Sequence, residues 1–376
     1  MRNVLPELVT WLDAGAPVAL ATVVGTWDSA PSAPGAAMVV GPDGSAVGSV
    51  SGGCVESDVY ALAEQVLVDG RPVLQRYGGV DMDSDAVGLP CGGTIEVFVE
   101  RVTRSSFPQL SGVADDAAAS RPVAVATVVE HVDRTRVGLR LVVRDGAQPA
   151  EGSLGSDPLD TAVAADARGL LLAGASGALT YGVDGERLGS ELRVFVSSLA
   201  PKPRMLLFGA TDFTVALARL GTTLGYRVTV CDARPVFTTA ARFPGADVVV
   251  DWPHRYLSAE VHAGRVDATT ALCVLTHDHK FDVPLLEVAL SLPALGYLGA
   301  LGSRRTVADR HRRLRDSGVT EEQLARLASP MGLDLGAQTP EETAVSIVAE
   351  IIGQRRGSRG WSRGRRLADL EGRIHH

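Results

Sequence analysis

Two glycine-flanked cysteines are the residues of this chain whose types and surroundings best suit chemistry. Cys54 follows Ser-Gly-Gly and precedes Val-Glu, and Cys91 lies in Leu-Pro-Cys-Gly-Gly. Glycines let a backbone approach a ligand closely and leave amide N–H groups unobstructed. If the fold brings the two loops together, they form a sulfur pair lined with amides, which suits an oxyanionic or metal-bearing ligand. The candidate cofactor-binding residues of these two segments are Gly52, Gly53, Cys54, Glu56, Cys91, Gly92 and Gly93.

A degenerate second copy of the same segment lacks both cysteines. The octapeptide Pro-Val-Ala-Leu-Ala-Thr-Val-Val at 17–24 recurs as Pro-Val-Ala-Val-Ala-Thr-Val-Val at 122–129, and Gly-Ser, Tyr-Gly and Val-Phe-Val recur downstream of both. Where the first copy has Gly-Gly-Cys, the second has Gly-Ser-Asp-Pro at 155–158, in which Asp157 and Pro158 fit a helix N-cap and a first-turn proline. A shared fold therefore does not require the cysteines. A site in the first copy explains them better than the alternative, in which both are small buried residues in tight turns.

The elements that must position the cysteines form a small α+β unit in each copy. Residues 18–24 and 36–40 are predicted as strands, 55–67 as a helix and 94–100 as a strand. We assign residues 1–103 to the first copy and 104–200 to the second. Cys54 is then expected at a helix N-terminus, where the helix dipole stabilises a thiolate. Glu56 would either compensate that dipole or contact the ligand.

The C-terminal half changes pattern after Pro-Lys-Pro at 201–203. Apolar strands are predicted at 205–208, 227–231, 248–250, 271–275 and 296–298, with helices between them. This alternation predicts a Rossmann-like, doubly wound parallel sheet over residues 201–357. Thr-Pro-Glu-Glu at 339–342 is a capping box that opens a helix running through Ile352. Residues 358–376 are rich in arginine, glycine and serine and are expected to be a flexible tail.

The nucleotide-binding fingerprint of this half is degraded. Gly209 keeps the first glycine of Gly-x-Gly-x-x-Gly, but Thr211 replaces the second and Asp212 places a carboxylate where phosphate would lie. Asp232 occupies the position that usually binds ribose hydroxyls. Ser303 and Arg304 are additional cofactor-binding candidates. NAD(P) binding thus remains an alternative.

The carboxyl edge of the predicted sheet also carries acid–base candidates. His277 and Asp278 follow the fourth strand, in a segment with two histidines and two carboxylates at 277–282. Neighbouring side chains point in different directions, so a general polar site is favoured over a metal site. If the protein is an NAD(P)-dependent oxidoreductase, His277 or Asp278 would act as its acid–base group.

Composition excludes several classes of protein. Across 376 residues the net charge is −8, which argues against non-specific nucleic-acid binding. The chain has no apolar run of the roughly 20 residues that a membrane span needs, and we expect a cytoplasmic protein whose four cysteines are reduced thiols. Its length predicts two or three domains.

Several of these motifs together resemble the XdhC/CoxI family. The resemblance rests on Gly-Ser-Val-Ser-Gly-Gly-Cys-Val-Glu at 48–56, Gly-Leu-Pro-Cys-Gly-Gly at 88–93, Leu-Thr-His-Asp at 275–278, Gly-Ser-Arg-Arg at 302–305 and Pro-Met-Gly-Leu-Asp-Leu-Gly-Ala at 330–337. The family usually has Gly-Ser-x-Pro-Arg near the first strands, whereas this chain has Asp-Ser-Ala-Pro-Ser at 28–32.

The resemblance implies a cofactor chaperone rather than an enzyme. Family members bind molybdenum cofactor (molybdopterin), protect it during sulfuration and help insert it into xanthine dehydrogenase or CO dehydrogenase-type molybdenum hydroxylases. The implied partners are such a hydroxylase client, a cysteine desulfurase and a second copy of the chain in a homodimer. Some relatives are described as xanthine dehydrogenases or oxidoreductases, and a pure scaffold that binds only the client is a third hypothesis.

Overall fold

A computed structural model describes residues 1–78, 89, 92–146, 148–276 and 278–356. The chain divides into two compact units, Met1–Pro201 and Lys202–His376, which we describe separately. Among the described residues, none of the helices is long and apolar enough to cross a lipid bilayer.

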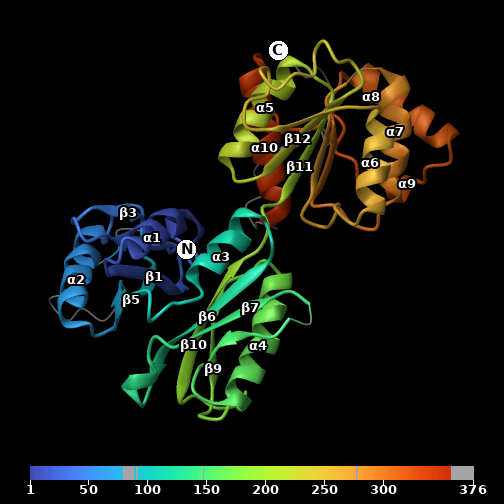
Figure 1. Cartoon of the computed structure of the whole chain (residues 1–376). Helices are drawn as coiled ribbons and strands as arrows, with labels where there is room; N and C mark the ends of the chain where they lie inside the picture. The colour runs from blue at the N-terminus through green and yellow to red at the C-terminus, as the bar shows by residue number, and fades with distance from the viewer. Residues whose placement is uncertain (79–88, 90–91, 147, 277, 357–376) are drawn as a thin grey trace. The chain divides into compact units, whose positions relative to one another are not determined.

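The N-terminal unit contains two antiparallel five-stranded sheets of the same topology (Figure 1). Their strand orders are β3-β2-β1-β5-β4 and β8-β7-β6-β10-β9. The first sheet consists of β1 Val18–Trp27, β2 Ala37–Val40, β3 Ala46–Gly48, β4 Val73–Tyr77 and β5 Thr94–Val102, and carries α2 Glu56–Asp69. The second consists of β6 Val123–His131, β7 Arg140–Arg144, β8 Glu151–Gly152, β9 Gly177–Tyr181 and β10 Leu192–Leu199, and carries α4 Asp157–Leu172. The predicted α+β fold and its duplication are therefore correct.

The two copies match residue by residue in the segment that leads to the first cysteine. Gly48 and Gly152 end β3 and β8 with φ of +90° and +94°. A Cβ at Gly48 would lie 2.3 Å from the carbonyl oxygen of Ala37, and one at Gly152 would lie 2.4 Å from that of Arg140. Both positions therefore require glycine. From here to Tyr77 and Tyr181, equivalent residues are separated by 104 positions.

Our prediction missed the short edge strands and the helices that connect the copies. β3 and β8 have three and two residues and are largely exposed, and β4 and β9 are only partly buried, so none of them shows a strong apolar pattern. The 3-10 helices η1 Arg2–Val4 and η2 Arg134–Arg136 and the helices α1 Leu5–Asp13 and α3 Leu110–Ala118 were also not predicted. α1 and α3 pack in one apolar cluster that includes residues of both copies.

Ion pairs join β5 of the first copy to strands of the second copy within the N-terminal unit. Glu100 of β5 and Arg140 of β7 form a buried pair, and Glu96 of β5 pairs with Arg193 of β10. Burial raises the pKa of Glu100, although Arg140 opposes this effect. Such a pair is costly to break because either partner alone would be a buried charge.

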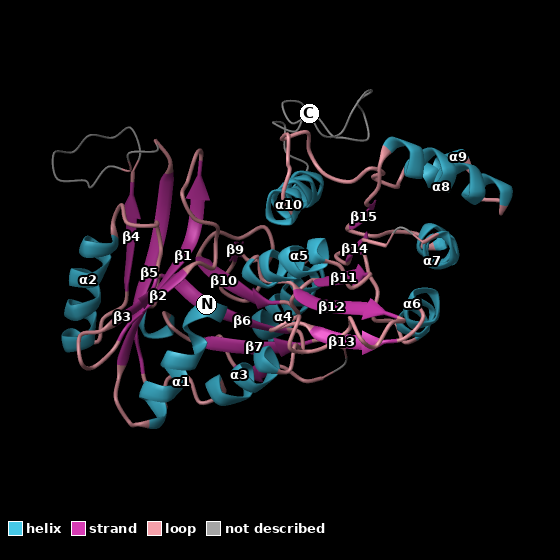
Figure 2. Cartoon of the chain, turned by 90° about the horizontal axis from the view of Figure 1, so that it is seen from above, coloured by secondary structure: helices cyan, strands magenta, loops and turns pink. Residues whose placement is uncertain are grey.

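The C-terminal unit is a parallel five-stranded sheet in the order β13-β12-β11-β14-β15, as predicted for a Rossmann-like fold. Its strands are β11 Arg204–Phe208, β12 Arg227–Asp232, β13 Asp247–Val250, β14 Ala271–Val274 and β15 Tyr297–Ala300. Figures 1 and 2 show α5 Asp212–Thr223 and α10 Pro340–Arg356 on one side of the sheet, with α6 Pro253–His262, α7 His279–Ser291 and α8 Arg304–Asp316 on the other. The short α9 Glu321–Leu324 follows α8. Hydrogen bonds between Thr339 and Glu342 confirm the predicted capping box.

Candidate functional site

The first cysteine loop presents an exposed thiol immediately before α2. Cys54 is exposed and free, and it lies two residues before the first residue of α2 rather than in its first turn. Gly52 and Gly53 have φ of +76° and +119°, in the left-handed region, with open space around both. These glycines are therefore needed for the path of the backbone.

The Glu56 carboxylate organises this loop. Oε1 accepts hydrogen bonds from the hydroxyl of Ser49 and from the amides of Val50 (3.2 Å) and Ser51 (2.8 Å). Oε2 accepts from the Ser51 hydroxyl and from the amides of Gly53 (2.8 Å) and Val55 (3.3 Å). A single side chain thus ties together nearly every residue between β3 and α2.

This set of donors strongly favours the ionised form of Glu56. Partial burial alone would raise the pKa of Glu56, but hydrogen bonds from Ser49, Ser51 and Gly53 outweigh it and lower the pKa to about 2. The described contacts give Glu56 a role in organising the loop, which is neither of the two roles considered from the sequence.

The amides of the glycine-cysteine segment are occupied by the loop itself. The N–H of Gly52 donates to Ser49 Oγ (2.8 Å), and the N–H of Cys54 donates to Ser51 Oγ (2.9 Å). Since the amide of Gly53 is bound to Glu56, all three amides have internal acceptors. The thiol of Cys54 is therefore what this loop offers to a ligand.

The second copy keeps the loop anchor but not the thiol. Asp160, equivalent to Glu56, accepts from the amide of Leu154 at 2.7 Å, and Ser153 Oγ accepts from the amide of Gly155 at 3.0 Å. Pro158 stands at the position of Cys54. Asp157 is the first residue of α4 and Ser156 is its N-cap, one residue earlier than we predicted. The second copy keeps an acidic residue that holds this loop but has no cysteine. The folding of the loop therefore accounts for the presence of Glu56 but not for that of Cys54.

The second cysteine, Cys91, lies outside the described residues, but its neighbours are described. Leu89 is buried in the same apolar cluster as Val50 and Val55, which flank the first loop. The amide of Gly92 donates to the carbonyl oxygen of Leu89 at 3.0 Å across positions 90 and 91. A Cβ at Gly93 would lie 2.5 Å from the amide nitrogen of Ala30. Gly93 is therefore required by a close backbone approach to the loop at 28–32.

That neighbouring loop contains the departure from the family pattern. Asp28 has φ of +56°, a conformation that glycine adopts easily and that aspartate tolerates better than most residues. Asp28 therefore adopts a left-handed conformation in which a glycine would also fit. The side chain of the usual arginine is replaced by that of Ser32.

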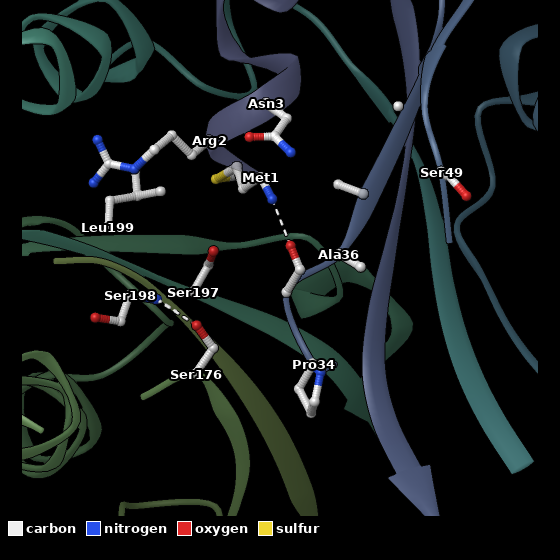
Figure 3. Close-up of a pocket in the computed structure, with 13 residues that line it drawn as sticks. Met1, Arg2, Asn3, Pro34, Ala36, Ser49, Ser176, Ser197, Ser198 and Leu199 are labelled. Carbon is white, nitrogen blue, oxygen red and sulfur yellow. Dashed lines mark hydrogen bonds between the residues drawn. The ribbon is translucent and has the colours of Figure 1, made fainter. Parts of the chain in front are cut away.

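A cavity of about 510 Å³ lies between the two copies within the N-terminal unit (Figure 3). The Met1 amino group donates to the Gly35 carbonyl oxygen on one side, and the Ser198 amide donates to Ser176 Oγ at 3.0 Å on the other. Its described lining is rich in small and hydroxyl-bearing residues and holds no cysteine, histidine or carboxylate. We therefore centre the candidate site on the thiol loop.

Asp232, the candidate ribose-binding residue of the C-terminal unit, is hydrogen-bonded by other residues of the same unit. Asp232 accepts from the amide of Ala210 (2.7 Å) and from both the Nε and the Nη2 of Arg234 (2.9 and 2.7 Å). Burial would raise the pKa of Asp232, but the bonds from Arg234 and Ala210 outweigh it and lower the pKa. We did not predict Arg234, although its place two residues after Asp232 was visible in the sequence.

The adjoining glycine turn is closed by similar contacts. A Cβ at Gly209 would lie 2.6 Å from the side chain of Thr276, so this glycine serves a close approach between two loops. Thr211 caps α5 through a capping box with Thr214, and Asp212 pairs with Arg242 at 2.7 Å. The residues that weaken the fingerprint therefore have structural roles.

The remaining described candidates at this sheet edge lie at the starts of helices. Asp278 caps α7 by accepting from the amide of Lys280, and Ser303 caps α8 by accepting from that of Thr306. Arg304 lies in the first turn of α8, and its buried Nε has no acceptor among the described residues. His277 lies outside the described residues. The part of the chain that is described contains no cluster of three or more potential metal ligands.

Asp282, also in this segment, has a structural role that sequence reasoning missed. It forms a buried ion pair with Arg310 of α8 at 2.8 Å, and Arg310 also donates to the Ser329 hydroxyl at 3.1 Å. Cys231 and Cys273 are buried, and burial raises the pKa of Cys231 to about 12. Among the described cysteines, Cys54 alone is exposed.

Comparisons with known proteins agree with the duplicated α+β fold and the Rossmann unit. The model of the XdhC and CoxI family matches residues 11–78 and 117–182, which fall in the two copies, and the model of the XdhC Rossmann domain matches residues 205–351. The chain belongs to the XdhC/CoxI family.

Named relatives match nearly the full length. The chain is 32% identical to a Bacillus subtilis protein named as a probable xanthine dehydrogenase subunit, over 90% of this chain and 93% of the relative. It is 28% identical to the "Molybdenum cofactor insertion chaperone PaoD" of Escherichia coli, over 94% of this chain and 88% of the relative. A crystal structure described as a xanthine dehydrogenase from Bacillus halodurans superposes with a TM-score of 0.71 and 26% identity, covering 95% of this chain and 98% of that one.

Proposed function

We propose that this protein is a molybdenum-cofactor chaperone that binds its cargo at the Cys54 loop and delivers it to a molybdenum hydroxylase of the xanthine dehydrogenase or CO dehydrogenase type. The observation that carries the proposal is the chemistry of this loop. Its amides and its one carboxylate are satisfied internally, and it presents an exposed thiol that the second copy lacks. The name of the Escherichia coli relative supports molybdenum cofactor as the cargo.

The loop suits reversible capture because it is organised before the cargo arrives. Six hydrogen bonds to Glu56 hold the backbone around Cys54, so binding costs little conformational entropy. We assign Cys91 as a second sulfur ligand. Its described neighbour Leu89 shares a core with Val50 and Val55, which flank the first loop.

The other parts of the chain have accessory roles in this proposal. Residues 1–103 hold the cargo and 104–200 brace that unit through the Glu100–Arg140 pair. Residues 201–357 provide a second ligand surface and the contact of a homodimer, and 358–376 form a tail. The partners are the hydroxylase client and a cysteine desulfurase, which acts while the cargo is protected.

An NAD(P)-dependent oxidoreductase is less well supported. The Asp232 carboxylate, which would bind ribose, is occupied by Arg234 and Ala210, and Ala210 also lies in the turn that would meet the pyrophosphate. A nucleotide would have to displace both contacts. Titration with NADH separates the hypotheses, because affinity below 1 mM (roughly −4 kcal/mol) that is lost in Asp232→Ala would favour the oxidoreductase.

The direct test is retention of molybdopterin by purified variants. Cys54→Ala and Cys91→Ala should each retain much less molybdopterin than wild type, measured by the fluorescence of the oxidised pterin. Pro158→Ala is the matched control, because Pro158 is exposed and occupies the position of Cys54 in the second copy. Equal retention in wild type and both cysteine variants would contradict the proposed function.

A further inference from the structure

The cavity between the two copies lies at a position whose equivalent in the duplicated fold holds a buried ion pair. Glu100 of β5 pairs in register with Leu20 of β1, and Ser197 of β10 pairs in register with Val125 of β6. Leu20 and Val125 are the fourth residues of the repeated octapeptide. Ser197, which lines the cavity, is therefore the equivalent of Glu100.

The cation of that ion pair is replaced as well. Ala37 pairs with Thr22 of β1 and Arg140 pairs with Thr127 of β6, and both threonines are the sixth residue of the octapeptide. Ala37, which also lines the cavity, is thus the equivalent of Arg140. One contact between the copies holds a buried carboxylate and guanidinium, whereas the equivalent position holds a cavity.

Arg2 supplies a positive charge to this cavity without an anionic partner. Its Nη1 and Nη2 donate to the carbonyl oxygens of Ala117 (3.1 Å) and Ala200 (2.6 Å), and no carboxylate pairs with it in the part of the chain that is described. A guanidinium has five N–H donors, so further donors are available. Burial, which disfavours the charged form, lowers the pKa of Arg2. Since Arg2 is the only charged side chain of the described lining, an anion would find a cation here and no competing carboxylate.

Ser197 adds a buried hydrogen-bond donor to the same cavity. It is 4% exposed, and its hydroxyl has no hydrogen-bond partner within the described residues. Figure 3 shows this hydroxyl directed towards the side of the cavity that Met1 and Arg2 form. A buried hydroxyl without a partner costs free energy, so an acceptor inside the cavity would be stabilised. An oxyanion is both such an acceptor and a counter-charge for Arg2.

The size of the cavity fits a small molecule better than a bare ion. Its volume of about 510 Å³ lies within the range of roughly 300–1,000 Å³ that is typical of small-molecule sites. Much of the lining is glycine, alanine and serine, whose short side chains leave room for an occupant. The expected occupant is therefore an organic molecule that carries a carboxylate or phosphate group.

We propose that this cavity binds a small molecule through an oxyanion group, a carboxylate or a phosphate, that accepts a hydrogen bond from Ser197 and pairs with Arg2. The oxyanion takes the position that the Glu100 carboxylate has at the equivalent contact. The second copy thus contributes directly to a binding site, in addition to bracing the first.

The oxyanion has two possible sources. Ser49, another residue of the lining, donates to Glu56, which holds the Cys54 loop. The phosphate ester of a molybdopterin cargo is therefore one source, and this alternative rests on the proposed function. A separate small acid is the other source and does not depend on it.

Ser197→Glu tests the proposal without any ligand, because it restores the carboxylate found at the equivalent position. Ser197→Gln is the matched control, since it has the same size and no charge. Calorimetry should show Ser197→Glu melting a few degrees higher than Ser197→Gln, because its carboxylate would pair with Arg2. If Ser197→Glu melts lower than Ser197→Gln, or fails to fold while Ser197→Gln folds, the cavity does not favour an anion and the proposal is wrong.

Titration with inorganic phosphate tests binding itself. By isothermal titration calorimetry at constant ionic strength, wild type should bind phosphate with a Kd of about 1 mM. Arg2→Gln and Ser197→Glu should each bind at least about tenfold more weakly. Arg71→Gln, which changes an exposed arginine of the same unit, should bind as wild type does. Phosphate affinity that is equal in wild type and Arg2→Gln, or wild type that binds no phosphate up to about 20 mM, would overturn the proposal.

Molybdopterin retention by Ser197→Glu distinguishes the two sources. Retention that is lost in this variant and kept in Ser197→Gln would identify the oxyanion as the phosphate of the cargo. Retention that is equal in both would identify it as a separate small acid. If wild type itself retains no molybdopterin, the proposed function fails, while the stability and phosphate measurements still decide whether this cavity is an oxyanion site.

Discussion

Replacing Glu56 by glutamine should loosen the cysteine loop while keeping its size. Each carboxylate oxygen of Glu56 now accepts three hydrogen bonds. Glutamine has one carbonyl oxygen and one NH₂ group, so its NH₂ group would replace one of these oxygens and would meet the N–H and O–H donors without being able to accept from them. The substitution also mimics the protonated form of Glu56. Its cost can therefore be worked out from the shift in pKa.

The expected magnitude is about 2 kcal/mol. The pKa of Glu56 falls from 4.5 to about 2, and each unit is worth roughly 1.4 kcal/mol, so the ionised form stabilises the folded loop by at most about 3 kcal/mol. Solvent screens this partly exposed carboxylate, which reduces the contribution to about 2 kcal/mol. Because the folded pKa is lowered, the stabilisation is present above pH 4.5 and is lost as the pH falls towards 2. Glu56→Gln should lack that pH dependence.

Hydrogen–deuterium exchange of residues 49–55 measures this directly. At pH 7 the loop amides of Glu56→Gln should exchange about thirtyfold faster than those of wild type. Asp160→Asn is the matched control in the second copy, where the described contacts give one amide bond instead of four. It should accelerate exchange at residues 153–155 only about fivefold.

Equal acceleration of exchange in the two variants would contradict the role of Glu56 in holding the loop. If the amides of residues 49–55 exchange at the same rate in Glu56→Gln and in wild type, the carboxylate does not hold the loop. Wild-type protection that is the same at pH 5 and pH 2.5, after correction for intrinsic rates, would contradict the lowered pKa.

Two predictions concern the scaffold. Gly48→Ala should destabilise the N-terminal unit by about 3 kcal/mol, because its Cβ would lie 2.3 Å from the Ala37 carbonyl oxygen at a φ of +90°. Gly52→Ala is the control, because Gly52 has a similar φ but open space around it, and it should cost only about 1 kcal/mol in urea unfolding. Equal costs of the two substitutions would rule out the clash at Gly48. Arg310→Ala should destabilise the C-terminal unit by about 3–5 kcal/mol, because it leaves the buried Asp282 carboxylate without its cation; calorimetry that shows an unchanged C-terminal transition would contradict this role.

The fold was largely predictable because its signals are repetitive. The octapeptide at 17–24 and 122–129 forms β1 and β6, and the alternation of strands and helices after residue 203 gave the parallel sheet. The short edge strands β3 and β8 were not predictable, because two or three residues are too few to show the alternation of apolar and polar side chains that marks a strand. Their pairing depends on β2 and β7, which lie elsewhere in the sequence.

The contacts of the candidate site residues were not predictable from the sequence. An acid in the first turn of a helix can point to solvent, to a ligand or back to the preceding loop, and spacing does not distinguish these for Glu56. The retained acid at Asp160, 104 residues later, was the available signal for a structural role. Similarly, Asp232 has the spacing of a ribose ligand, but its occupation by Arg234 depends on side-chain geometry.

Alkylation of Cys54 tests the central claim most directly. Purified protein with and without bound molybdopterin would be treated with iodoacetamide, and modification of each cysteine would be measured by mass spectrometry. We predict that Cys54 is modified readily without the cargo and is protected with it, while the buried Cys231 and Cys273 remain unmodified in both. Full modification of Cys54 in protein that still holds its molybdopterin would contradict binding at this thiol.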